Sequence, residues 1–140
     1  MSARAVTRAD AGDDEPLAIV AGGAALKDAL LTGLPRAIGV LAVVAVEAII
    51  ATIEKRRICL VLIDIRAGAP GSIELARTIK STFPDVPVIL TTDRPDFELA
   101  VAALRLGVDD LFTDPLDLER VVTRSVELLA SAERRRAAAE

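Results

Sequence analysis

Short apolar runs alternate with longer amphipathic segments along most of this chain, from Leu17 onward. The runs predict buried strands, because a parallel sheet covered on both faces needs strands that are apolar almost throughout. They lie at Leu17–Ala21, Ala37–Val44, Cys59–Asp64, Val88–Thr92 and Asp110–Thr113. The segments after them predict helices at Ala24–Thr32, Val46–Arg56, Ser72–Thr82, Asp96–Leu106 and Leu116 to about Arg136. This order predicts one doubly wound α/β domain, a five-stranded parallel sheet flanked by five helices.

The two ends of the chain differ from this alternation. Residues 1–16 carry charges throughout and no apolar segment, which predicts a disordered lead-in rather than a signal peptide. Residues 17–130 hold the strand and helix pattern, and residues 131–140 continue the last helix as an extension. The basic run Arg134 to Arg136 in that extension is interpreted as a solvated helix end that complements the helix dipole.

Composition excludes several kinds of chemistry. The chain has no His, so catalysis by histidine, histidine-bound zinc and histidine phosphorylation are ruled out. Its single cysteine, Cys59, cannot form an internal disulfide and suits a small core position. The net charge of −4 gives no basic field for nucleic acid. No apolar run reaches the roughly 20 residues that span a bilayer, so we expect a cytoplasmic domain without nucleic-acid or membrane partners.

Small and polar residues follow the predicted strands. In a doubly wound sheet, ligands bind beyond the carboxyl ends of the strands, near the point where strand order reverses. At these ends the chain places Ala21, Gly22, Gly23, Asp64, Thr91, Thr92, Asp93, Thr113, Asp114 and Pro115. Asp64 is a candidate functional carboxylate because five apolar residues precede it. The same position also suits an aspartate that only accepts backbone N–H bonds in the following loop.

Four sequence blocks follow one another in an ordered series: Leu60–Arg66, Ser72–Lys80, Val86–Thr92 and Glu98–Pro115. Together they resemble the receiver domain of bacterial two-component response regulators, over about Leu17 to Ala130. The order and spacing of the blocks make this resemblance more specific than any one motif. It implies a flavodoxin-like receiver architecture and a signalling module rather than an enzyme.

The resemblance also assigns roles to residues at the strand ends. Asp64 falls at the phosphoacceptor position, and Thr92 at the position of the hydroxyl that contacts the phosphoryl group. Where receivers have two adjacent acidic residues that hold Mg²⁺, this chain has Ala21 and Gly22. Where they have a lysine before proline, it has Asp114.

Further departures lie elsewhere in the pattern. Leu111 stands at the aromatic switch position, Gly68 where the family commonly has proline, and Ser72 where it commonly has glycine. These departures and those at the strand ends together predict a degenerate site.

The departures at the strand ends remove two ligands of Mg²⁺ and one lysine. Phosphoryl transfer to a carboxylate needs such cations, because they neutralise the charge on the transferring oxygens. We expect no bound cofactor and at most weak Mg²⁺, because two of the probable anionic ligands are missing. Two carboxylates about 5 Å apart, as Asp64 and Asp114 would be, repel by roughly 3 kcal/mol at an effective dielectric of 20. Asp93 could replace a metal ligand, and Arg66 or Arg94 could replace the cation.

The sequence therefore predicts a stand-alone receiver-like module in phosphorelay signalling that acts by protein contact with little phosphotransfer. In the family the output face joins the fourth helix, the fifth strand and the fifth helix, which places Arg105, Leu111 and Phe112 on it. A sensor histidine kinase or a downstream effector would bind there. The extension of the last helix could pair with a second copy, or could fray.

Three alternatives stay open from the sequence. The first is an ordinary receiver that a histidine kinase phosphorylates on Asp64. The second is a small flavodoxin-like enzyme or ligand-binding domain, in which residues 21–24 let a phosphate approach a helix N-terminus. The third is a detached receiver-like segment of a larger regulatory enzyme.

Overall fold

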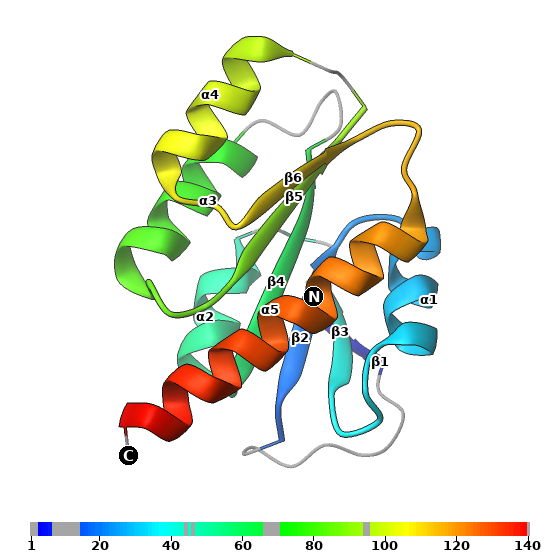
Figure 1. Cartoon of the computed structure of the whole chain (residues 1–140), viewed down its shortest axis with the longest axis vertical. Coiled ribbons are helices and arrows are strands. Elements are labelled where there is room, and N and C mark those ends of the chain that lie inside the picture. The colour runs from blue at the N-terminus through cyan, green and yellow to red at the C-terminus, as the bar shows by residue number, and fades with distance from the viewer. Residues whose placement is uncertain are drawn as a thin grey trace.

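A single sheet with helices on both faces forms the described part of the chain (Figure 1). The computed structural model describes residues 3–6, 15–43, 45, 47–65, 71–93 and 96–139, and of residues 3–6 only the backbone. The strands are β1 (Ala3–Val6), β2 (Leu17–Ala21), β3 (Gly39–Val43), β4 (Ile58–Ile65), β5 (Val88–Thr92) and β6 (Asp110–Thr113). The helices are α1 (Ala24–Gly33), α2 (Ala48–Lys55), α3 (Ser72–Thr82), α4 (Phe97–Leu106) and α5 (Leu118–Ala139).

The strands lie in the order β1-β3-β2-β4-β5-β6, and β2 to β6 run parallel to one another. The chain first moves outward from β2 to β3 and then crosses back to place β4 on the other side of β2. This topology confirms the doubly wound α/β fold with five parallel strands and five helices. The strand order therefore reverses between β2 and β4, and such sheets bind ligands outside the carboxyl ends of the strands at that point.

The ends of most elements agree with the sequence prediction. The bounds of β2, β5, β6 and α3 coincide with it. The strand β3 begins two residues later than predicted, because Ile38 closes a turn by donating its N–H to the Pro35 carbonyl at 2.9 Å. The helix α5 begins at Leu118 rather than Leu116, because Asp117 caps it by accepting the Arg120 N–H at 3.3 Å.

The prediction of a disordered N-terminus is wrong for residues 3–6, which form the edge strand β1. This strand pairs antiparallel with β3, with Ala3 opposite Val43 and Val6 opposite Val40. Without β1, the edge of β3 would present unpaired backbone N–H and C=O groups. Four residues can pair with these groups through their own backbone, so β1 needs no recognisable apolar run. Residues 1–2 and 7–14 lie outside the described residues, and domain limits at residues 17 and 130 stay predictions.

Two apolar clusters bury the two faces of the parallel strands. The first packs α2, α3 and α4 against the sheet, and the second packs α1 and α5 against its other side. Along β4 the side chains alternate: Ile63 belongs to the first cluster and Leu62 to the second. Asp64 therefore lies on the α1–α5 side, at the end of the strand. None of the described helices combines the length and the apolar character that a membrane span requires.

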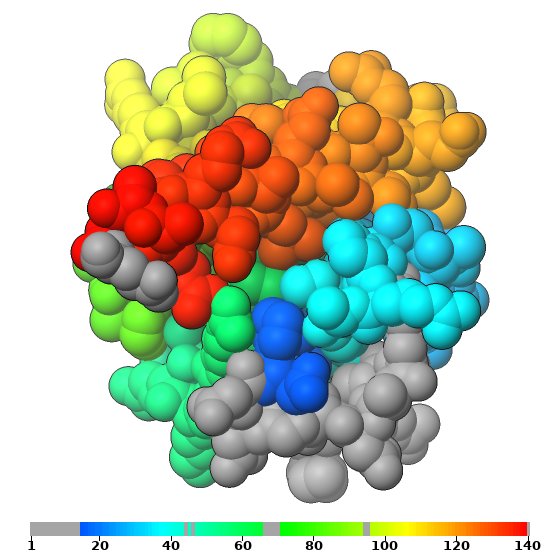
Figure 2. Space-filling view, turned by 60° about the horizontal axis from the view of Figure 1, so that its bottom comes forward, coloured from blue at the N-terminus to red at the C-terminus, as the bar shows by residue number. Residues whose placement is uncertain are grey.

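The last residue of α1, Gly33, lies against α5, which runs beside α1 across one face of the molecule (Figure 2). A Cβ at Gly33 would overlap the side chain of Val122. We expect Gly33→Ala to lower the free energy of unfolding by about 1–3 kcal/mol, as overpacking commonly does.

Urea denaturation followed by circular dichroism measures this change. In a Val122→Ala background the same substitution should cost much less, because the overlapping methyl groups are gone. If Gly33→Ala instead stabilises the protein, as helix propensity alone predicts, the close contact has no energetic weight.

Candidate functional site

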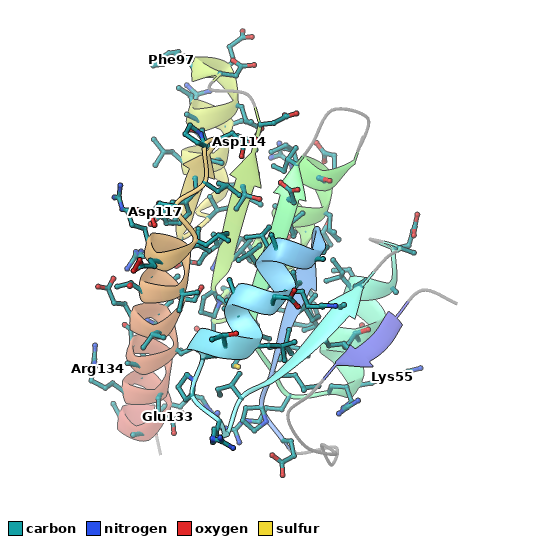
Figure 3. All side chains as sticks on the ribbon, turned by 90° about the vertical axis from the view of Figure 1, so that its right-hand side faces the viewer. Lys55, Phe97, Asp114, Asp117, Glu133 and Arg134 are labelled. Carbon is teal, nitrogen blue, oxygen red and sulfur yellow. The ribbon has the colours of Figure 1, made fainter. Side chains whose placement is uncertain are left out.

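The carboxyl ends of four parallel strands bring the predicted site residues to one edge of the sheet. In the strand register Ala21 lies opposite Ile63, Asp64 opposite Thr91, and Thr92 opposite Thr113. The Asp114 N–H donates to the Thr92 carbonyl at 3.0 Å, which ties the turn after β6 to the end of β5. Figure 3 shows Asp114 at the end of the molecule where the arrowheads of these strands lie. The carboxyl ends of successive strands therefore bring together Gly22, Asp64, Thr92 and Asp114, which lie in these strands or directly after them.

The Asp64 carboxylate accepts a hydrogen bond from a neighbouring threonine. The Thr91 hydroxyl donates to Oδ1 of Asp64 at 2.7 Å, with Thr91 fully buried and Asp64 half-buried. The two residues share a face of the sheet because they lie side by side on parallel strands. The receiver resemblance indicates Thr92 instead, which is also buried, and its contact with a phosphoryl group stays a prediction. The alternation of side chains along β5 is the signal that points to Thr91.

Gly22 lies directly beside Asp64. A Cβ at Gly22 would be 3.2 Å from the Asp64 Cβ and 3.1 Å from Cδ1 of Leu26, closer than ordinary van der Waals contact. The backbone of Gly22 therefore approaches the Asp64 side chain so closely that a Cβ would need its neighbours to shift by a few tenths of an ångström. Ala21 is 7% exposed and packs in the α2–α3–α4 cluster, so its methyl group lies among apolar side chains.

These two residues do not fit the Mg²⁺ site that the receiver resemblance implies. Mg²⁺ needs oxygen ligands in a near-octahedral arrangement, and neither Ala21 nor Gly22 supplies a side-chain oxygen. Within the described ranges, no three acidic or cysteine side chains are grouped so that they could hold a metal ion.

Asp93 is the remaining candidate for a replacement ligand. Its Oδ1 is buried and has no hydrogen-bond partner among the described residues. A buried carboxylate oxygen without a hydrogen-bond partner favours a cation nearby. The other two candidates for replacement, Arg66 and Arg94, lie outside the described residues.

Asp114 follows β6 and is exposed, and its peptide bond to Pro115 is cis. Exposure places this carboxylate in a high-dielectric environment, where solvent screens its charge. Its repulsion of Asp64 is therefore weaker than the value expected from the sequence for a pair at lower dielectric.

The predicted output face joins α4, β6 and α5 on one side of the molecule (Figure 1). Leu111 and Phe112 are half-buried, since Leu111 packs on the α2–α3–α4 cluster and Phe112 on the α1–α5 cluster. Arg105 is exposed. A groove of about 480 Å³ separates β6 from α5 on this face.

Among the described residues, the large apolar side chains that are exposed belong to α4, and the sequence pattern does not indicate them. Phe97 is 82% exposed and Leu104 is 77% exposed. They are seven residues apart, about two helical turns, so they lie on one side of the helix. Figure 3 shows Phe97 directed away from the sheet. Two exposed apolar side chains on one side of a helix are a candidate for contact with another protein.

Known proteins share both the sequence pattern and the fold. The response regulator receiver domain family matches residues 13–125. The transcriptional regulatory protein ZraR of Klebsiella oxytoca is 37% identical over 71 residues, covering 51% of this chain and 16% of that protein. The heme response regulator HssR of Staphylococcus aureus is 31% identical over 78 residues, covering 56% of this chain and 34% of that protein. The chain thus spans about a third or less of the length of these relatives.

Solved structures share the fold. A response regulator receiver domain protein (CheY-like) from Methanospirillum hungatei superposes with a TM-score of 0.70 at 21% identity, over 87% of this chain and 98% of that one. At this identity the likeness concerns the fold. The sequence match over most of the chain, together with the strand-end aspartate on a doubly wound sheet, shows that this chain belongs to the response regulator receiver domain family.

Proposed function

We propose that this receiver domain is a degenerate member of its family, which signals by protein contact and depends little on Mg²⁺-assisted phosphorylation of Asp64. The observation that carries the proposal is the packing of the Gly22 backbone against Asp64. An acidic side chain at Gly22 would crowd Asp64 and Leu26, and glycine itself supplies no ligand. The apolar surroundings of Ala21 and the negative charge of Asp114 support the same conclusion.

The exposed face of α4 supports a protein as the partner. Phe97 and Leu104 provide apolar contact area, and Arg105 beside them provides a charge that selects among partners. A sensor histidine kinase or a downstream effector is the proposed class of partner. Pairing of two copies through the extension of α5 is a further prediction, as are the absence of enzymatic activity and of nucleic-acid or membrane partners, and the cytoplasmic location.

An ordinary phosphorylated receiver is the second candidate function, and the unsatisfied Oδ1 of Asp93 favours it. That oxygen could bind a cation together with Asp64. A phosphate bound at residues 21–24 is disfavoured, because the Asp64 side chain lies beside Gly22 and its negative charge would repel the phosphate.

A titration with Mg²⁺, followed by NMR, tests the proposal. We expect no saturable shift of the amides of Gly22, Asp64 and Thr91 at low millimolar Mg²⁺, and no change with beryllofluoride. The absence of Trp and Tyr makes NMR the suitable method. Saturable shifts centred on Asp64 and Asp93, abolished by Asp93→Asn, would instead support the ordinary receiver.

A further inference from the structure

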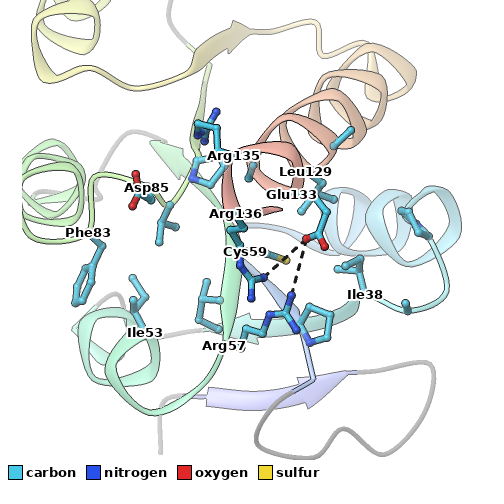
Figure 4. Close-up of a pocket in the computed structure, with 18 of the residues that line it drawn as sticks. Ile38, Ile53, Arg57, Cys59, Phe83, Asp85, Leu129, Glu133, Arg135 and Arg136 are labelled. Carbon is cyan, nitrogen blue, oxygen red and sulfur yellow. Dashed lines mark ion pairs between the residues drawn. The ribbon is translucent and has the colours of Figure 1, made fainter. Parts of the chain in front are cut away.

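A cavity of about 850 Å³ opens at the end of the sheet opposite Asp64 (Figure 4). Its walls come from residues at or before the amino ends of the parallel strands, from the end of α2, and from the last turns of α5. These turns overhang the sheet and close one side of the cavity. Its volume lies within the range of small-molecule sites, about 300–1,000 Å³.

The lining combines an aliphatic surface with a charged rim. The larger aliphatic side chains in it are Ile38, Ile53, Ile58, Val86, Val126 and Leu129. The charged residues are Arg56, Arg57, Arg135 and Arg136 against Asp85 and Glu133, four positive charges and two negative ones. Apart from Cys59, no neutral hydrogen-bonding side chain lines the cavity among the described residues. Phe83 adds an aromatic side chain to the aliphatic surface, and the excess of positive charge at the rim suits an anion that carries an apolar chain.

Glu133 marks where an anion fits. Its Oε2 lies 3.9 Å from Nη2 of Arg57 and 3.8 Å from Nη1 of Arg136, as the dashed lines in Figure 4 show. The Glu133 side chain is 71% exposed, so these ion pairs are weak and can be exchanged. An incoming carboxylate can replace Glu133 between the two guanidinium groups while its chain lies on the aliphatic surface. Arg135 and Arg136 are exposed, as the interpretation of a solvated helix end predicts, and both also line this cavity.

We propose that this cavity binds an amphiphilic monocarboxylate with a flexible aliphatic chain, a medium-chain fatty acid in chemical class. A guanidinium pair recognises a carboxylate by charge-assisted hydrogen bonds. The end of α5 from a second copy is a poor occupant. It would bring its own three arginines and one glutamate to a rim that is already positive.

Alkylation of the cysteine in the lining can be used to measure ligand binding in the cavity. Cys59 is the single cysteine of the chain and its Sγ donates to the Leu17 carbonyl at 3.2 Å. Burial raises the pKa of its thiol to about 11, while Arg57 and Arg136 lower that pKa. Alkylation by iodoacetamide at alkaline pH, followed by intact-mass spectrometry, should therefore be slow and sensitive to a ligand in the cavity.

The test uses the full chain with sodium decanoate, kept below its micelle concentration, and decanol as the neutral control. We expect decanoate to slow alkylation saturably and decanol to have much less effect. Arg136→Glu should raise the concentration for half protection about fivefold or more, and Glu133→Gln should lower it about twofold, because the competing carboxylate is removed. Each variant is compared with its own ligand-free rate, since the charges also change the thiol pKa.

Arg134→Glu is the matched control. It makes the same charge change in the same helical turn, but Arg134 does not line the cavity and points away from it (Figure 3). If Arg136→Glu unwinds the end of α5 by circular dichroism, Arg57→Gln replaces it. The proposal fails if decanoate gives no protection, or if Arg134→Glu weakens protection as much as Arg136→Glu. It also fails if alkylation without ligand slows as protein concentration rises, which would identify a second copy as the occupant.

Discussion

The substitution Asp114→Lys is expected to speed phosphorylation of Asp64 by a small phosphodonor such as acetyl phosphate, by roughly ten- to a hundredfold. The change removes a negative charge from the strand-end edge and supplies an ammonium group that can pair with phosphoryl oxygens. The Asp114 N–H is bonded to the carbonyl of Thr92, so the residue already lies beside the end of β5. Intact-mass spectrometry measures the fraction modified with time.

The control is Asp85→Lys, which makes the same net charge change in an exposed turn at the other end of the sheet. It should leave the rate unchanged, and adding Asp64→Asn to Asp114→Lys should abolish the modification. Equal gains from Asp114→Lys and Asp85→Lys would show a general effect of net charge and not repair of the site.

Acidic residues placed at Ala21 and Gly22 are expected to add a Mg²⁺ dependence, but the structure limits the gain. Gly22→Asp must displace Asp64 or Leu26, since its Cβ would lie 3.1–3.2 Å from them. Leu26→Val removes the crowding δ-carbons, so Mg²⁺ should act more strongly in its presence. If the protein with Ala21→Asp, Gly22→Asp and Asp114→Lys folds normally yet stays inert, loss of cations is not what disables the site.

The fold could be predicted because its strands are nearly uniform apolar runs separated by helical segments of the right length. The edge strand β1 could not, since its four residues are interrupted by Arg4 and lie among charges. Backbone pairing with the open edge of β3 forms this strand, and that edge exists only once the sheet is assembled.

The candidate site could be predicted as a set of strand ends, but not as a set of contacts. Asp64 and Thr91 meet because β4 and β5 pair in one register, which sequence spacing does not determine. The approach of Gly22 to Asp64 depends on how α1 and β4 pack. The arginine rim joins Arg57 and Arg136, which are far apart in the chain, so no local pattern indicated it.

On the output face, Phe97→Asp and Leu104→Asp are each expected to weaken partner binding by roughly ten- to a hundredfold. Burying a Phe or Leu side chain in an interface contributes about 1.5–3 kcal/mol, which corresponds to that range. Both side chains are largely exposed in the free domain, so their loss should leave its stability almost unchanged. Arg105→Glu should act mainly on the association rate and the salt dependence, as charges at the rim of an interface do.

Asp64→Asn distinguishes signalling by protein contact alone from signalling that depends on phosphorylation of Asp64. If contact through α4 carries the signal without phosphate, this substitution should leave partner binding and oligomeric state unchanged, because it alters a pocket that the partner does not need. Arg77→Glu is the matched control for Arg105→Glu, since Arg77 is an exposed arginine on α3. Affinity capture from the native host identifies the partner, and titration of that purified partner with each variant, alongside light scattering, measures both properties. An Asp64→Asn protein that loses the partner, while Phe97→Asp and Arg105→Glu keep it, would show that the pocket is a working switch and that the domain is an ordinary receiver.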